Sequence, residues 1–135
     1  MLLRVIAVTA AILAFMTTGG SRGALAQTFD VKVKSGVSTL VGDFFVVSRE
    51  DCSAQAIPDA RVRTQGRNGR AEVRRARGRL QSFCAGAIVN GVQFYYVSAR
   101  GYRGADEVVI DIPWETYVDA ASRSMRTHTY RITVE

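Results

Sequence analysis

Residues 92–97 read V-Q-F-Y-Y-V, residues 101–106 read G-Y-R-G-A-D, and residues 107–112 read E-V-V-I-D-I. The first and third runs are rich in β-branched and aromatic residues, which favour strands. The glycines between them favour a tight corner. We therefore expect a strand that ends, turns and re-enters a sheet, a pattern that indicates an architecture and not a reaction.

Each residue of this corner can be assigned a structural role. Gly101 and Gly104 can adopt the positive φ that a side chain disfavours. Tyr102 can bury its ring while its hydroxyl bonds to the backbone. Asp106 can accept backbone N–H groups and close the loop. The alternative is a calcium site with carboxylates at 106, 111, 115 and 119, but calcium needs six to eight converging oxygens and these residues follow no recognised loop spacing.

The stretch from 85 to 135 resembles the penultimate-strand region of bacterial immunoglobulin-like and cadherin-like domains. In those families an aromatic strand leads into G-[YF]-x-G-x-D and then an apolar strand. The matching residues here are Tyr96, Gly101, Tyr102, Gly104, Asp106 and the final strand at 130–134. The resemblance implies a fold and a non-catalytic role in adhesion, spacing or binding, although fold alone does not establish function.

The rest of the chain also divides into short β-rich runs. Polar and apolar residues alternate at 29–33 and 127–134, and a strand at 39–47 is interrupted by Gly42, which indicates a bulge. Two Asn-Gly pairs, at 68–69 and 90–91, predict hairpin turns that join 61–64 to 71–74 and 85–89 to 92–97. Residues 115–125 are expected to form a loop.

About seven strands, with turn signals every 8–12 residues and no amphipathic helix, are typical of an all-β domain. We expect a single immunoglobulin-like β-sandwich, with a small β-barrel as the alternative. The sequence contains no internal repeat and no interdomain linker.

The N-terminus is predicted to be an export signal, comprising residues 1–26. A short basic start precedes an uncharged apolar run at 5–16, and Ala24-Leu25-Ala26 supplies small residues at the cleavage site. That run is shorter than the roughly 20 residues that a membrane-spanning helix needs, so no stable membrane insertion is expected after cleavage. The mature domain would comprise residues 27–135 and be periplasmic or secreted. It would carry 16 basic and 12 acidic residues, a net charge of +4.

Cys52 and Cys84 are the only cysteines. Two thiols in an exported chain are expected to pair, because export leads to an oxidising compartment. A metal-binding or redox pair is disfavoured, since the chain has no C-x-x-C and two thiols with one histidine cannot fill a four-ligand zinc site. We expect neither a metal site nor a cofactor.

Residues 61–79 hold eight arginines against one acid, Glu72. A hairpin with such a stripe would present several guanidinium groups to phosphates or carboxylates. The predicted docking residues are Arg67, Arg70, Arg74, Arg75 and Arg77. The alternative is a solvated edge that its charge protects from pairing with other sheets. Nucleic acid is not expected as a partner, because no aromatic platform is interleaved with the arginines.

His128 is the only histidine and lies in the alternating run at 127–134. It could act as a general base, but no G-x-S-x-G nucleophile elbow is present, and a half-buried or edge position is favoured. The aromatic residues at 44–45 and 94–96 alternate between faces, so one face is expected to fill the core while the other could stack on sugar rings.

These features favour an exported, non-enzymatic binding or structural module of the bacterial envelope. Its partner could be an anionic envelope component or a protein. A secreted inhibitor or accessory subunit of another protein is the second hypothesis, and a small hydrolase that uses His128 is the third.

Overall fold

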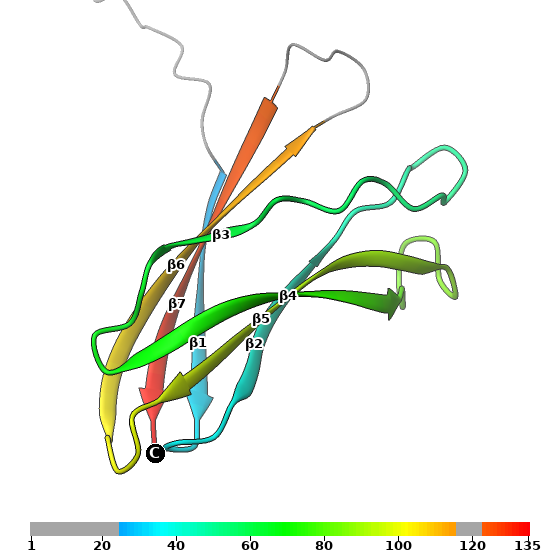
Figure 1. The fold of residues 1–135 in the computed structure, drawn as a ribbon. Coiled ribbons are helices and arrows are strands. Elements are labelled where there is room, and N and C mark those ends of the chain that lie inside the picture. The colour runs from blue at the N-terminus through cyan, green and yellow to red at the C-terminus, as the bar shows by residue number, and fades with distance from the viewer. Residues whose placement is uncertain (1–24, 116–122) are drawn as a thin grey trace, which may run out of the picture.

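The described part of the chain folds into seven strands in two sheets (Figure 1). The computed structural model describes residues 25–115 and 123–135. The predicted export signal therefore lies almost entirely outside the described residues. The strands are β1 (Leu25–Val33), β2 (Thr39–Phe45), β3 (Arg61–Thr64), β4 (Gly69–Arg79), β5 (Ile88–Ser98), β6 (Gly104–Glu115) and β7 (Arg123–Val134).

One sheet has the strand order β1-β7-β6-β3 and the other β2-β5-β4. The first strand, β1, pairs in parallel with the last, β7, whereas the remaining neighbours pair antiparallel. The two sheets remain open and do not close on one another, so the barrel alternative is wrong. The all-β prediction of two packed sheets is confirmed.

The core lies between the sheets and comes mainly from β5, β6 and β7. Alternate residues of each strand point inward, as strand geometry requires. The largest fully buried side chains include Phe94 and Tyr96 of β5, Ile110 and Ile112 of β6, and Tyr130 of β7. One face of the aromatic run at 94–96 therefore fills the core, as predicted, while Tyr95 points to the other side of the sheet.

The predicted turn at Asn90-Gly91 is wrong, because both residues lie inside β5. Gly91 pairs with Phe45 of β2 on one side and with Ala76 of β4 on the other. A β-carbon at Gly91 would lie 2.5 Å from the Phe44 carbonyl oxygen and 2.8 Å from Phe45 Cε1. Glycine is needed at this position because the Phe45 ring packs directly over the strand. From the sequence alone, a glycine required for packing cannot be distinguished from a glycine required for a turn.

The predicted hairpin between 61–64 and 71–74 is also wrong. β3 pairs with β6 in one sheet, whereas β4 pairs with β5 in the other. The residues between them cross from sheet to sheet, and the N–H groups of Arg67 and Asn68 bond to Asp106 instead of turning a hairpin. The bulge predicted near Gly42 is confirmed by a register shift between Leu40 and Gly42.

Cys52 and Cys84 are joined by a disulfide, as predicted, with their Cα atoms 5.6 Å apart. Cys52 lies in the loop between β2 and β3, and Cys84 in the loop between β4 and β5. The bond therefore ties two loops at the same end of the β2-β5-β4 sheet.

Candidate binding surface

β4 carries most of the predicted docking arginines and is an edge strand with one neighbour, β5. Its register places Ala71 opposite Tyr96, Val73 opposite Phe94 and Arg75 opposite the buried Val92. Alternation along the strand puts Arg75 and Arg77 on this core-side face. The remaining β4 arginines of the set, 70 and 74, lie on the outer face with Glu72. The predicted residues are thus divided between two faces of one strand.

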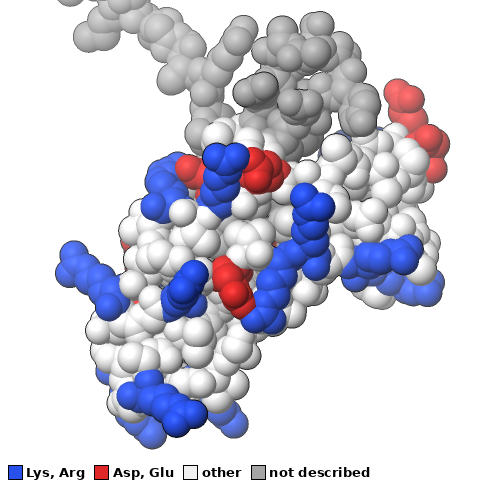
Figure 2. Space-filling view, viewed as in Figure 1, with Lys and Arg blue, Asp and Glu red and all other residues white. Residues whose placement is uncertain are grey.

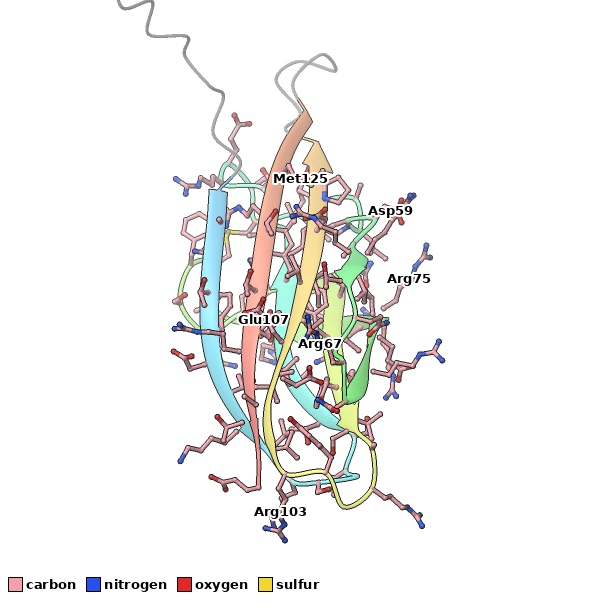
Figure 3. The ribbon with its side chains drawn as sticks, turned by 90° about the vertical axis from the view of Figure 1, so that its left-hand side faces the viewer. Asp59, Arg67, Arg75, Arg103, Glu107 and Met125 are labelled. Atoms are coloured by element: carbon pink, nitrogen blue, oxygen red, sulfur yellow. A yellow bond between two sulfur atoms is a disulfide. The ribbon has the colours of Figure 1, made fainter. Side chains whose placement is uncertain are left out.

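Arg75 and Arg77 remain exposed although they belong to the core-side face. Figure 1 shows the C-terminal end of β4 and the N-terminal end of β5 projecting beyond the sheet that contains β6 and β7. Because the opposing sheet does not cover this part of β4, its arginines are solvated. In Figure 3, Arg75 points away from the body of the domain.

The outer face is partly neutralised. Arg74 forms an ion pair with Glu72, and its guanidinium carbon lies 4.2 Å above the centre of the Tyr95 ring. A shallow groove of about 190 Å³ lies beside these residues and is lined also by Ser38, Arg70, Tyr96 and Val97. The ion pair and the ring hold the Arg74 head group in place, so it is less available than a free guanidinium to an incoming anion.

On the core-side face of β4, in contrast to the outer face, the arginine charges are not neutralised by a described acidic neighbour. Within residues 25–115 and 123–135, neither Arg75 nor Arg77 has an ion-pair partner. Figure 2 shows basic side chains spread over this side of the molecule, with acidic side chains beside several of them. Arg67 lies apart, in the crossover between β3 and β4, where its backbone N–H bonds to Asp106 at 2.9 Å.

Gln65 takes part in this surface and was not predicted from the sequence. Its side-chain amide donates to the Ala71 carbonyl oxygen at 2.9 Å and accepts from the Ala71 N–H at 2.8 Å. One side chain thereby satisfies both backbone groups that Ala71 presents at the free edge of β4. A single glutamine before a turn carries no sequence signal for this role, because the contact depends on how the crossover is folded.

Asp106 is a structural residue that holds three segments together. Its Oδ1 accepts from the N–H groups of Arg67 (2.9 Å) and Glu107 (3.0 Å), and its Oδ2 accepts from the Asn68 N–H (3.2 Å) and the Tyr96 hydroxyl (2.5 Å). Burial alone would raise the pKa of Asp106, but these hydrogen bonds outweigh it and lower the pKa below its ordinary value. Both oxygens face donors, which is opposite to what a cation requires.

The rest of the corner is also as predicted. Gly101 and Gly104 have φ values of +79° and +134°. The Tyr102 hydroxyl donates to the Ala105 carbonyl oxygen at 2.6 Å, and its ring packs against the core. The glycine-tyrosine-aspartate pattern thus closes the turn from β5 to β6.

The other candidate calcium ligands do not converge with Asp106. Asp111 accepts from Arg63 Nε at 2.7 Å and from the Thr127 hydroxyl at 2.9 Å, and chiefly the Arg63 hydrogen bond lowers its pKa. Asp119 and the side chain of Glu115 lie outside the described residues. Across the two described segments, no group of three or more His, Cys, Asp or Glu side chains could hold a metal ion.

His128 is buried, with 4% of its surface exposed. Its Nδ1 lies 3.2 Å from the Tyr130 hydroxyl, and the rings of Phe29, Phe44 and Phe94 lie around it with centroids 5.0–6.2 Å away. Burial, and then the positive charge of Arg126, lower the pKa of the imidazole. An imidazole enclosed by aromatic rings has little access to a substrate, which favours a core role.

No protein-family model matches the chain, and comparison with curated proteins and with solved structures finds no match either. Within the residues that the structure covers, no helix is long and apolar enough to cross a membrane.

Proposed function

We propose that this protein is an exported, non-enzymatic immunoglobulin-like module that binds an anionic partner through the arginines of β4. The binding role is supported chiefly by Arg75 and Arg77. Both are exposed on an edge strand and have no ion-pair partner in the described chain. Opposite charges steer a partner to such a surface and set its register.

The strand order supports the immunoglobulin-like assignment. Immunoglobulin-like domains pack a sheet that contains strands B, E and D on one that contains strands G, F and C. The order β2-β5-β4 matches the first sheet and β7-β6-β3 the second. Tyr102, at the connection between β5 and β6, bonds to nearby backbone at the corner where such domains carry a characteristic tyrosine.

The compartment assignment rests on the export signal and on the disulfide. A bond between Cys52 and Cys84 suits an oxidising compartment. Cleavage after Ala26 would leave residues 27–33 of β1 in place, with their register on β7.

The proposal is tested with two anionic probes, poly-glutamate and purified lipopolysaccharide. We expect at least one of them to bind the mature domain, residues 27–135, and to lose affinity steeply between low and physiological salt, since screening weakens contacts between exposed charges. The triple variant Arg70→Glu/Arg75→Glu/Arg77→Glu should abolish this binding.

A second triple variant, Lys34→Glu/Arg100→Glu/Arg103→Glu, changes the net charge equally but lies away from β4, and it should bind more strongly than the first. Equal loss in both variants would mean that only the net charge matters. Unaltered binding in the first variant would overturn the proposal. Thermal midpoints should change by only a few degrees in both, because exposed substitutions typically alter stability by less than about 0.5 kcal/mol.

The hypothesis of an inhibitor or accessory subunit differs in that the partner is a protein. One observation favours it over a polysaccharide or lipid ligand, namely that β4 is an edge strand with backbone groups available for pairing.

A further inference from the structure

We infer that the free edge of β4 binds an extended acidic peptide segment of a partner protein as an additional, antiparallel β-strand. The inference rests on the proposed anion-binding function and names the partner and the mode of binding. It depends on which backbone groups β4 presents and on which side chains accompany them.

The outward backbone groups of β4 are identified by Gln65. Since the N–H and C=O of Ala71 bond to this side chain, they do not bond to β5. Backbone groups of an antiparallel edge strand point alternately toward and away from the neighbouring strand. The N–H and C=O groups of Val73, Arg75 and Arg77 therefore point outward as well. In the described part of the chain these groups have no hydrogen-bond partner.

Gln65 also indicates what the edge can bind. Its amide offers one donor and one acceptor, as the backbone of an extended residue does, and it occupies the place that a neighbouring strand would take. Beyond Ala71 the same edge continues, and no described residue covers Val73, Arg75 and Arg77 in this way. A peptide in extended conformation would continue the hydrogen-bonding pattern along these residues, as in known cases of strand addition.

The side chains select an acidic peptide. Arg75 and Arg77 project from the core-side face about 7 Å apart, the spacing of alternate residues in a strand. A residue directly opposite each of them on an added strand would point to the same face. Glutamate or aspartate at alternate positions of the peptide would thus meet both guanidinium groups. A second copy of this chain is disfavoured, because β4 paired with β4 would place arginines close to arginines.

The useful length of the edge is limited. Arg79 donates from Nη1 to the Gly86 carbonyl oxygen, and its own carbonyl oxygen accepts from the Gln81 side chain at 3.4 Å. Because Arg79 bonds to residues of the loop that follows β4, it is not available to pair with an added strand. The open edge therefore extends from Val73 to Arg77, long enough for a short peptide segment but not for a long strand.

The test uses a short capped peptide in which glutamate alternates with valine, added to the mature domain and measured by calorimetry. Two modified peptides leave the protein unchanged. In an antiparallel pairing, N-methylation of the glutamate amides removes the N–H groups that would face β4, whereas N-methylation of the valine amides removes those that would face solvent. We expect the first to weaken binding about tenfold or more, since the hydrogen bonds to the edge of β4 are lost, and the second to have a much smaller effect.

Variants of the protein give an independent readout. Arg75→Ala/Arg77→Ala should weaken the unmodified peptide more than Arg70→Ala/Arg74→Ala, which removes the same charge from the outer face. A peptide of equal composition with its glutamates in one block should bind less well than the alternating one.

The outcomes separate the two proposals. If poly-glutamate binds through Arg75 and Arg77 but N-methylation of the glutamates has no effect, the anion-binding function stands and strand addition is wrong. If an anionic polysaccharide such as heparin binds the same site as tightly as the alternating peptide does, the proposal that the ligand is a peptide is wrong. If no anionic probe binds, both proposals are wrong and β4 is a solvated edge that its charge protects from aggregation.

Discussion

The Tyr96 hydroxyl donates a hydrogen bond of 2.5 Å to Asp106 Oδ2 and thereby connects the two sheets. Tyr96 belongs to β5 in one sheet and Asp106 to β6 in the other. Burial and the nearby carboxylate raise the pKa of Tyr96 far above its ordinary value, so the hydroxyl remains a donor at all relevant pH values. Asp106 also accepts from the crossover between β3 and β4, which makes this pair the joint between three segments.

Replacing Asp106 by alanine is expected to destabilise the domain by about 2–4 kcal/mol, because it leaves several donors without their acceptor. Tyr96→Phe removes one hydrogen bond and should cost about 1 kcal/mol. Urea denaturation of both variants checks the order. A smaller loss for Asp106→Ala than for Tyr96→Phe would contradict the role of Asp106 as the shared acceptor.

Asp106 should also make stability depend on pH in the acid range. Its pKa is lower in the folded domain than the ordinary value of 3.8, so the folded state binds its proton less readily than the unfolded chain. The stabilisation is present above pH 3.8 and is lost as pH falls through the folded pKa. Thermal unfolding of Asp106→Asn between pH 5 and pH 2 should show a shallower acid decline than the parent, at constant ionic strength.

His128 should also make the domain less stable as pH falls, but in a pH range closer to neutral than that of Asp106. Burial and Arg126 lower its pKa from the ordinary 6.5, so stability should decrease as pH falls below 6.5 and level off below the folded pKa. His128→Leu should remove this component and leave only the decline due to carboxylates. Because the chain has one histidine, its ring proton signal can be followed directly by NMR. A midpoint at or above 6.5 in the folded domain would contradict the prediction.

Position 78 requires a glycine because the Phe45 ring lies directly over it. A β-carbon at position 78 would lie 2.7 Å from Phe45 Cζ and 2.9 Å from Cε1. Gly78→Ala should therefore cost about 1–3 kcal/mol, as overpacking does. With Phe45→Ala present, the same change should be neutral or stabilising, since alanine restricts the unfolded chain more than glycine. A double-mutant cycle in urea measures the coupling, and independent effects of the two changes would refute it.

The disulfide should contribute a large part of the stability of this domain. It closes a separation of 32 residues, for which chain entropy gives roughly 3.5–4 kcal/mol. The variant Cys52→Ser/Cys84→Ser should lose about 2–5 kcal/mol in urea denaturation. Thiol titration of the denatured, unreduced parent should find no free thiol, and two free thiols would show that the bond does not form in the mature protein.

Features that depend on neighbouring residues were predictable from the sequence. Alternation placed Ile132 and Val134 on the core side of the last strand, and both are buried. The glycines at 101 and 104 adopt positive φ because the corner is a local conformation, determined over a few residues. The pairing of Cys52 with Cys84 was also predictable, because the chain offers no other partner.

Features that depend on which strands meet were not predictable in the same way. Asn90-Gly91 has the composition of a turn, but a phenylalanine from another strand covers Gly91 and holds it inside β5. The segments at 61–64 and 71–74 have the pattern of a hairpin, yet β3 pairs with β6 and β4 with β5, and Asp106, about 40 residues away, accepts hydrogen bonds from the backbone between them. A local pattern is compatible with either outcome, and only long-range contacts select one.

The sequence by itself determined that the chain forms short alternating strands, a glycine corner, a disulfide and a strand rich in arginine. The tertiary structure decided which of those arginines share a face of β4. Strand alternation divides them between two faces, and the end of the opposing sheet leaves Arg75 and Arg77 solvated on the core-side face. It also decided that Gln65 covers Ala71 and that no other described residue pairs with the edge from Val73 to Arg77. The physical reason is that side-chain direction follows from local backbone geometry, whereas exposure and pairing follow from which distant segments pack against the strand.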